Sequence, residues 1–185
     1  MGLDMLWSIR GKSRRKIAAK HYALLTRAAL TPDLYEKGAA LDTFEGRAAM
    51  MTTHASVIFY RLKQIETSQS RKISDAINTL ILDGMDAAYR ELGVGDSSIA
   101  RKVRKLAEVH YGLGQALIAI LEMEESEQLE ALVKCFQRNH VSEPGKETAL
   151  ARYMQHNAQR FKQMPDAIVL TPEMSWTGIS EVPSC

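Results

Sequence analysis

Residues 43–65 read TFEGRAAMMTTHASVIFYRLKQI, and this stretch decides the fold. Its apolar residues recur at alternating spacings of four and three, which place them on one side of an α-helix. The series comprises Phe44, Ala48, Met51, Ala55, Ile58, Leu62 and Ile65. Thr43 is a candidate N-cap, because its hydroxyl can accept a hydrogen bond from a free N–H of the first turn. We therefore predict a long amphipathic helix at the centre of a helical protein.

Helical spacing continues on both sides of this stretch, whereas alternating strand-like runs are nearly absent. A second central helix is predicted over 97–123, where a four-three repeat is typical of a helix that lies nearly antiparallel to a neighbour. The other predicted elements lie at 13–30, 32–37, 71–92, around 129–136 and around 150–161. The sequence thus predicts an all-α fold of about seven helices.

The turn before the second central helix reads Gly93-Val94-Gly95-Asp96. Gly93 stands where a left-handed C-cap is wanted, and Asp96 or Ser97 can cap the helix that follows. A nucleotide-binding loop would follow a β-strand, and here a helix precedes the glycines. We predict a tight turn that holds two helices at a fixed angle.

The composition is that of one ordinary globular domain. The chain has 185 residues, 45% of them hydrophobic and 25% charged, with neither an apolar run long enough to span a bilayer nor the apolar core of a secretory signal. Cys135 and Cys185 are too isolated to suggest a disulfide framework, which fits a reducing cytoplasm. We divide the chain into an N-terminal arm (1–12), a helical domain (13–163) and an irregular C-terminal tail (164–185).

Positive charge is concentrated at the N-terminus. Residues 1–20 carry a net charge of +5, in a chain whose net charge is +2. Apolar residues stand next to these bases, an arrangement typical of segments that bind a membrane interface. The predicted membrane contacts are Trp7, Arg10, Lys12, Arg14, Arg15 and Lys16. RNA is the other anionic partner that suits this charge, and a basic terminus without a partner is the third interpretation.

Common signatures of catalysis are missing from the sequence. It contains no G-x-S-x-G, no G-x-x-x-x-G-K-S/T, no H-E-x-x-H and no C-x-x-C. None of the five histidines forms a pair at the spacing that two metal ligands on one helix need. We therefore expect a protein that is not an enzyme and that binds neither a metal ion nor a cofactor.

A basic patch is predicted at Arg101, Arg104 and Lys105, which share the solvent side of a helix. They lie in the first turns, where the helix dipole favours acids, so local stability does not explain them. Either this is a solvated face, or it docks an acidic partner or lipid headgroups.

A line of polar residues borders the apolar side of the helix over 43–65. Arg47, His54 and Arg61 follow one another at heptad spacing. Burying them would be costly without partners, so the edge of a groove is a sensible place for them. The simpler interpretation is three polar residues that frame a core helix.

Several stretches, taken in order, resemble a known family. They are Asp42-Thr43-Phe44-Glu45-Gly46-Arg47, His54, Arg61-Leu62, Met85-Asp86, Arg90-Glu91-Leu92-Gly93-Val94-Gly95-Asp96, Lys102 to Lys105, and Tyr111-Gly112. Together they look like the ubiquinol-cytochrome c chaperone domain over about 13–122, and R-E-L-G-V-G-D is the most specific part. The sequence departs from the family at 39–41, where Gly-Val-Pro is usual, and at Leu113, where arginine is frequent.

The resemblance implies a membrane-associated assembly chaperone that binds newly made cytochrome b for the biogenesis of ubiquinol-cytochrome c reductase. It also implies a small partner protein, contact with the ribosome, and a cytoplasmic location peripheral to the inner membrane, or the matrix side in a mitochondrion. We place the client surface along Arg47, His54 and Arg61, supported by the basic patch, and expect no DNA partner. The alternative is a peripheral helical adaptor that binds RNA or anionic membrane without a chaperone role.

Overall fold

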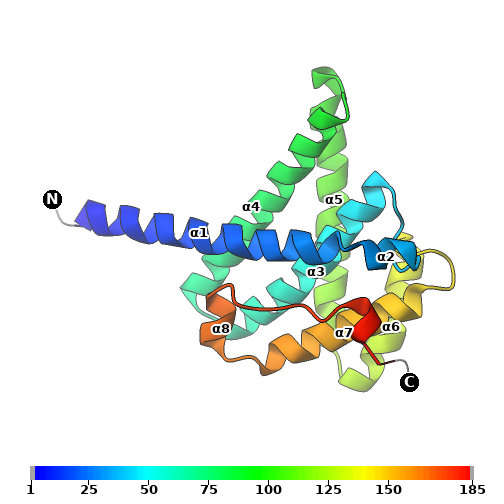
Figure 1. Ribbon diagram of the computed structural model, residues 1–185. Helices are drawn as coiled ribbons and strands as arrows, with labels where there is room; N and C mark the ends of the chain where they lie inside the picture. Colours follow the sequence, from blue (N-terminus) through cyan, green and yellow to red (C-terminus); the bar gives the residue numbers. More distant parts are fainter. Residues whose placement is uncertain (1–2, 184–185) are drawn as a thin grey trace.

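The computed structural model describes residues 3–183, with side chains from Arg15 onward apart from those of Asp96 and Ser97. Between residues 3 and 183 there is no β-strand, which confirms the all-α prediction. Figure 1 shows the helices crossing one another around α3. The elements are α1 (Leu3–Ala29), α2 (Pro32–Glu36), α3 (Phe44–Ile65), α4 (Ser68–Glu91), α5 (Asp96–Leu121), α6 (Glu125–Asn139), α7 (Glu147–Gln163), α8 (Asp166–Leu170) and the 3-10 helix η1 (Ile179–Glu181).

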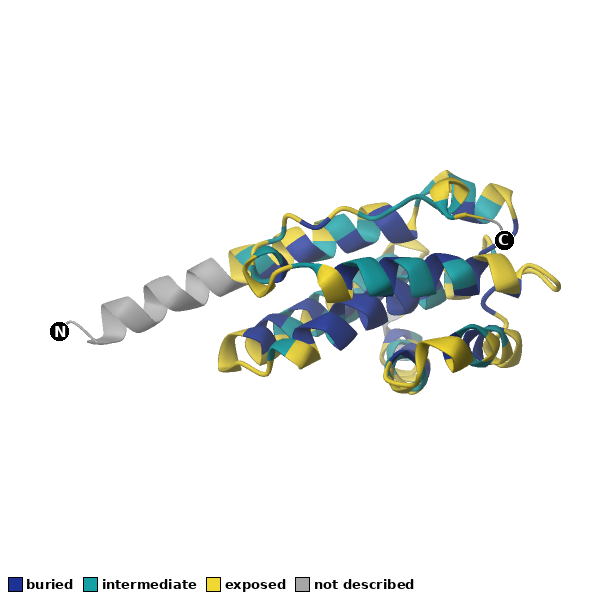
Figure 2. Ribbon diagram, turned by 90° about the horizontal axis from the view of Figure 1, so that it is seen from below, coloured by how far each residue is buried: buried dark blue, intermediate teal, exposed yellow. Residues whose placement is uncertain are grey.

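α3 is the central helix, as predicted. It packs against α1, α4, α5 and α7, and every residue from Thr52 to Ile58 is buried (Figure 2). Thr43 caps the helix as expected, because its hydroxyl accepts a hydrogen bond from the N–H of Gly46 at 3.0 Å. A side chain at Gly46 would clash with the carbonyl of Leu41, so the chain can enter α3 at this angle only with glycine there.

α4 and α5 form a hairpin whose tip stands away from the rest of the molecule (Figure 1). The tip contains Gly93, whose φ of 71° confirms the predicted left-handed position. The predicted cap of α5 was wrong by one residue: Gly95 is the N-cap and Asp96 is the first helical residue, because the carbonyl of Gly95 already accepts the first helical hydrogen bonds. Away from the tip, both helices pack on α3.

α1 begins earlier than predicted. It starts at Leu3, so Ser13 lies inside the helix and does not cap it. No proline interrupts residues 3–29, so the backbone chemistry does not stop the helix at 13. The C-terminal half of α1 crosses α3 and α4. Gly84 of α4 makes this crossing close, since a side chain there would collide with the hydroxyl of Tyr22.

The C-terminal segment packs on the helical body. It contains α8 and η1, joined by an extended strap over 171–178 (Figure 1). The sequence predicted an irregular, extended tail here but did not predict α8. Val169 and Met174 are buried. Asn157 of α7 fixes the strap, because its side chain accepts the N–H of Thr177 at 2.9 Å and donates to the carbonyl of the same residue at 3.3 Å. These residues therefore complete the core.

Candidate binding groove

A groove lies between α3, α4 and the N-terminal half of α5, and we call it the main groove. It holds about 360 Å³, a volume within the usual range of ligand-binding clefts. Its surface is mostly apolar, with lysines on the α5 side. The lining residues are Glu45, Ala48, Ala49, Thr52, Met85, Tyr89, Lys102, Lys105, Leu106, Val109 and His110.

A second groove of about 220 Å³ lies on the other side of the contact between α3 and α4, against α1. Ala48 and Met85 line both grooves. The rings of Phe44 and Tyr89 meet at 4.4 Å between their centroids and close the contact between the two helices. Two apolar hollows thus flank one ridge, which includes Phe44 and Met85 of the motifs quoted above.

The basic patch lies beside the main groove. Lys102 and Lys105 line it, and the ammonium of Lys102 stands 5.6 Å from the centre of the Tyr89 ring, within the range of a cation–π contact. Arg101 and Arg104 are exposed on the same helix, as the sequence predicts. Whether Arg101, Arg104 and Lys105 bind a partner stays a prediction.

A polar network holds the floor of the main groove. His110 of α5 is buried, with Nδ1 2.8 Å from the hydroxyl of Thr52 in α3 and Nε2 3.0 Å from the side-chain oxygen of Asn78 in α4. Asn78 also donates to the hydroxyl of Tyr111 at 2.9 Å. Burial lowers the pKa of His110 to about 4, so the imidazole is neutral at pH 7. The network fixes the hairpin on α3.

Arg47 lies at the second groove and is half exposed. Its guanidinium pairs with the carboxylate of Asp42, with Nε at 2.8 Å and Nη2 at 2.7 Å, and stands 4.9 Å from the ring centre of Tyr35. Among the three residues of the predicted line, Arg47 is the one that solvent reaches. A client contact through Arg47 stays a prediction.

The expectation that His54 borders an open groove was wrong, because the structure buries it. Its Nδ1 lies 2.8 Å from the carbonyl of Met50, so that nitrogen carries the proton, and Nε2 accepts the hydrogen bond of the Tyr153 hydroxyl at 2.8 Å. Trp176 covers the imidazole at 4.6 Å. Burial lowers the pKa of His54 to about 4, consistent with a neutral ring that joins α3 to α7.

Arg61 is also buried rather than at a groove edge. Its guanidinium donates to the carbonyls of Phe161 at 2.9 Å and Met164 at 2.8 Å, and pairs with Asp166 at 2.5 Å. It therefore supplies the C-terminal cap of α7 and fixes the turn into α8. The burial cost that suggested a groove edge is offset by these partners.

Of the predicted membrane contacts, Arg15 and Lys16 are exposed on α1. The side chains of Trp7, Arg10, Lys12 and Arg14 lie outside the described residues. No helix within the described part of the chain is long and apolar enough to cross a membrane. Nor does that part contain a cluster of His, Cys, Asp or Glu that could hold a metal ion.

Sequence reasoning missed the apolar lining of the main groove. Met85, Lys102 and Glu45 belong to the quoted motifs, but Tyr89 and Val109 do not. Val109 gives the clearest signal, because it is an apolar residue on the polar side of the helical repeat and is 48% exposed.

The protein is all-α over the described residues, and its apolar groove lies beside exposed bases. These features are typical of a helical binding protein. The family model for Ubiquinol-cytochrome C chaperone matches residues 36–176, so the chain belongs to the ubiquinol-cytochrome C chaperone family. The match starts after α1 and reaches Trp176, beyond the stretch over which the motifs were recognised. It includes the central helix, the hairpin and most of the strap.

A solved structure has the same fold. The crystal structure of the Cbp3 homolog from Brucella abortus superposes with a TM-score of 0.81 and covers 97% of this chain and 98% of that one. At 22% sequence identity this likeness shows the fold alone. No curated protein matches the sequence. Fold and family together make the chain a helical assembly chaperone.

Proposed function

We propose that this chain binds newly made cytochrome b and holds it for the biogenesis of ubiquinol-cytochrome c reductase. The main groove carries the proposal, because it offers apolar surface to a client while hydrogen bonds of His110 fix α5 to α3 and α4 beside it. An amphipathic or apolar helix can lie in such a groove and contact it through every third or fourth residue. Membership of the chaperone family supports this use of the groove.

Capture of the client should depend on Val109. The Val109→Glu change places a charge on the groove wall at a half-exposed position, so the fold should tolerate it. Burying that charge against an apolar client should cost about 1.5 kcal/mol or more, which is about tenfold in affinity. The measurement is the amount of newly made cytochrome b that co-purifies with the tagged chain.

The matched control is Met123→Glu, which changes a residue of similar exposure just beyond the other end of α5 and outside the groove. This control should capture the client as the unchanged chain does, and circular dichroism should be the same for all three proteins. Equal capture by the Val109→Glu variant would place the client elsewhere.

The second candidate function is a peripheral adaptor that binds RNA or anionic membrane, favoured by the exposed bases Arg15 and Lys16 on α1. Retention of cytochrome b, rather than of any polyanion, separates the two functions. Contacts with a small partner protein and the ribosome belong to the first proposal, as does a position beside the inner membrane. Neither of the two proposed functions involves a chemical reaction in the groove.

The N-terminal arm should hold the protein on anionic membranes. Deletion of residues 1–12 removes Arg10, Lys12 and the apolar residues beside them. Each base near an anionic surface contributes about 1 kcal/mol, so binding should weaken at least tenfold. Co-sedimentation with anionic and neutral liposomes measures this, and 1 M salt should reduce binding because the Debye length falls to about 3 Å. Equal binding by the full chain and by the version without residues 1–12 would show that the arm does not contact the membrane.

A further inference from the structure

The tip of the α4–α5 hairpin ends in an exposed apolar side chain. Leu92, at the C-cap of α4, is 62% exposed, the largest fraction among the exposed large apolar residues of the described chain. Around it, Gly93 and Gly95 have no atom within 4 Å of the place where a side chain would begin. Internal packing therefore does not account for Leu92, and the main groove does not include it.

A group of bases stands directly behind this tip. Residues 90–105 carry five bases, Arg90, Arg101, Lys102, Arg104 and Lys105, against two acids, Glu91 and Asp96. Arg101 and Arg104 are exposed and do not line the main groove. Arg101 lies five residues after Asp96, the first residue of α5, which corresponds to about 8 Å along the helix axis. The hairpin thus carries an apolar side chain, Leu92, at its tip, and the positive charges of Arg101 and Arg104 follow along α5 toward the body.

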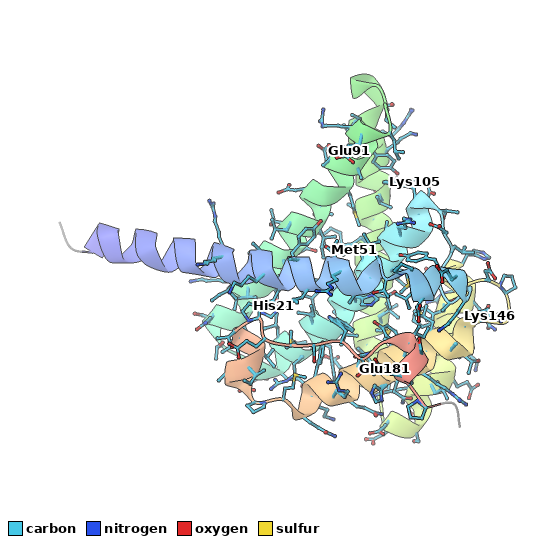
Figure 3. All side chains as sticks on the ribbon, viewed as in Figure 1. His21, Met51, Glu91, Lys105, Lys146 and Glu181 are labelled. Atoms are coloured by element: carbon cyan, nitrogen blue, oxygen red, sulfur yellow. The ribbon has the colours of Figure 1, made fainter. Side chains whose placement is uncertain are left out.

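The shape of the hairpin decides what kind of partner fits. The tip protrudes from the body (Figure 1), and Figure 3 shows Glu91 near its end with Lys105 closer to the body. A protruding end can meet a flat surface without collision. The headgroup layer of a bilayer is about 5–8 Å thick on each side, which is comparable to the distance between the tip and Arg101. RNA would use the arginines but would give Leu92 no role.

We propose that the tip of the α4–α5 hairpin is a membrane-docking site, in which Leu92 enters the interface of an anionic bilayer while Arg101 and Arg104 bind lipid phosphates. Arginine suits this task because its planar guanidinium binds phosphate oxygens in pairs. The site is separate from the N-terminal arm and from the main groove. Docking at the tip would place the groove beside the lipid surface, because Tyr89 and Lys102 line it within about one helical turn of Leu92 and Arg101.

The test measures binding of the full chain to vesicles of phosphatidylglycerol with phosphatidylcholine, and to phosphatidylcholine alone. We expect Leu92→Asp to weaken binding to the anionic vesicles about tenfold, and Arg101→Glu with Arg104→Glu to weaken it about 20-fold or more, at roughly 5-fold (about 1 kcal/mol) for each base. Leu92→Trp should keep or strengthen binding, because tryptophan favours the interface. The arm is present in every variant, so the ratios report the tip.

Two controls match these changes. Met123→Asp alters an exposed apolar residue just beyond the other end of α5, and Lys134→Glu with Arg138→Glu makes the same charge change on α6. Both should bind vesicles as the unchanged chain does. Unchanged binding by Leu92→Asp overturns the proposal, even if the arginine variant binds more weakly, because charge alone would then be responsible. Cytochrome b capture in detergent should survive Leu92→Asp, which separates this site from the main groove.

Discussion

Between pH 6.5 and about pH 4 the free energy of unfolding should fall by several kcal/mol, because His21, His54 and His110 are buried as neutral imidazoles. Burial lowers the pKa of each from 6.5 to about 4. Below pH 6.5 the unfolded chain binds protons at these residues and the folded chain does not. Stability is therefore fully present above pH 6.5 and is lost as the pH falls toward 4, by up to about 3 kcal/mol for each histidine.

Urea unfolding at pH 7, 6 and 5 measures this loss. His21 gives the cleanest variant, because neither of its ring nitrogens has a hydrogen-bond partner of good geometry among the described residues. His21→Leu should leave stability at pH 7 nearly unchanged or higher and should reduce the pH dependence by about a third. His140→Asn changes an exposed histidine and should leave the dependence as it was. Equal pH dependence in all three proteins would mean that His21 takes up a proton in the folded chain without cost.

Arg61→Ala should lower the free energy of unfolding by about 3 kcal/mol. The change removes the donors to the carbonyls of Phe161 and Met164, which lie at the end of α7, and it removes the packing of a buried side chain. Each buried carbonyl left without a donor costs about 1–3 kcal/mol. Thermal and urea unfolding measure the loss.

Asp166→Asn is the matched control for this change. Asp166 is mostly exposed, so its substitution keeps both carbonyl bonds of Arg61 and should cost under about 1 kcal/mol. Arg61→Lys should recover only part of the stability, because one ammonium cannot reproduce the fork of the guanidinium. If Arg61→Ala is as stable as the unchanged chain, the capping role of Arg61 is minor.

Local signals predicted the helices well. Thr43 and Gly93 mark helix ends through chemistry that involves only their own turns, and the apolar spacing of 43–65 does not depend on the rest of the fold. α8 was missed because a five-residue helix is too short for a periodic pattern and is stabilised by packing.

The candidate site was harder to predict, because its residues take their roles from distant partners. His54 meets Tyr153 and Arg61 meets Asp166 across 99 and 105 positions of sequence. Heptad spacing places both side chains on one border of α3, but it cannot say that α7 and the strap cover that border. The main groove depends on how α4 and α5 diverge from α3, which no spacing within one helix reveals.

α1 and the segment of α8 and the strap, which are far apart in the sequence, close the core together. His21 in α1 lies against the backbone of Val169 in α8, and Trp176 in the strap covers His54 and meets Phe161 at 4.8 Å. A ribosome releases these partners in order, so the face of α3 that carries His54 stays exposed to water until the strap has been made. This part of the core must then close late in folding, and a message truncated before Trp176 would yield a chain open to proteolysis.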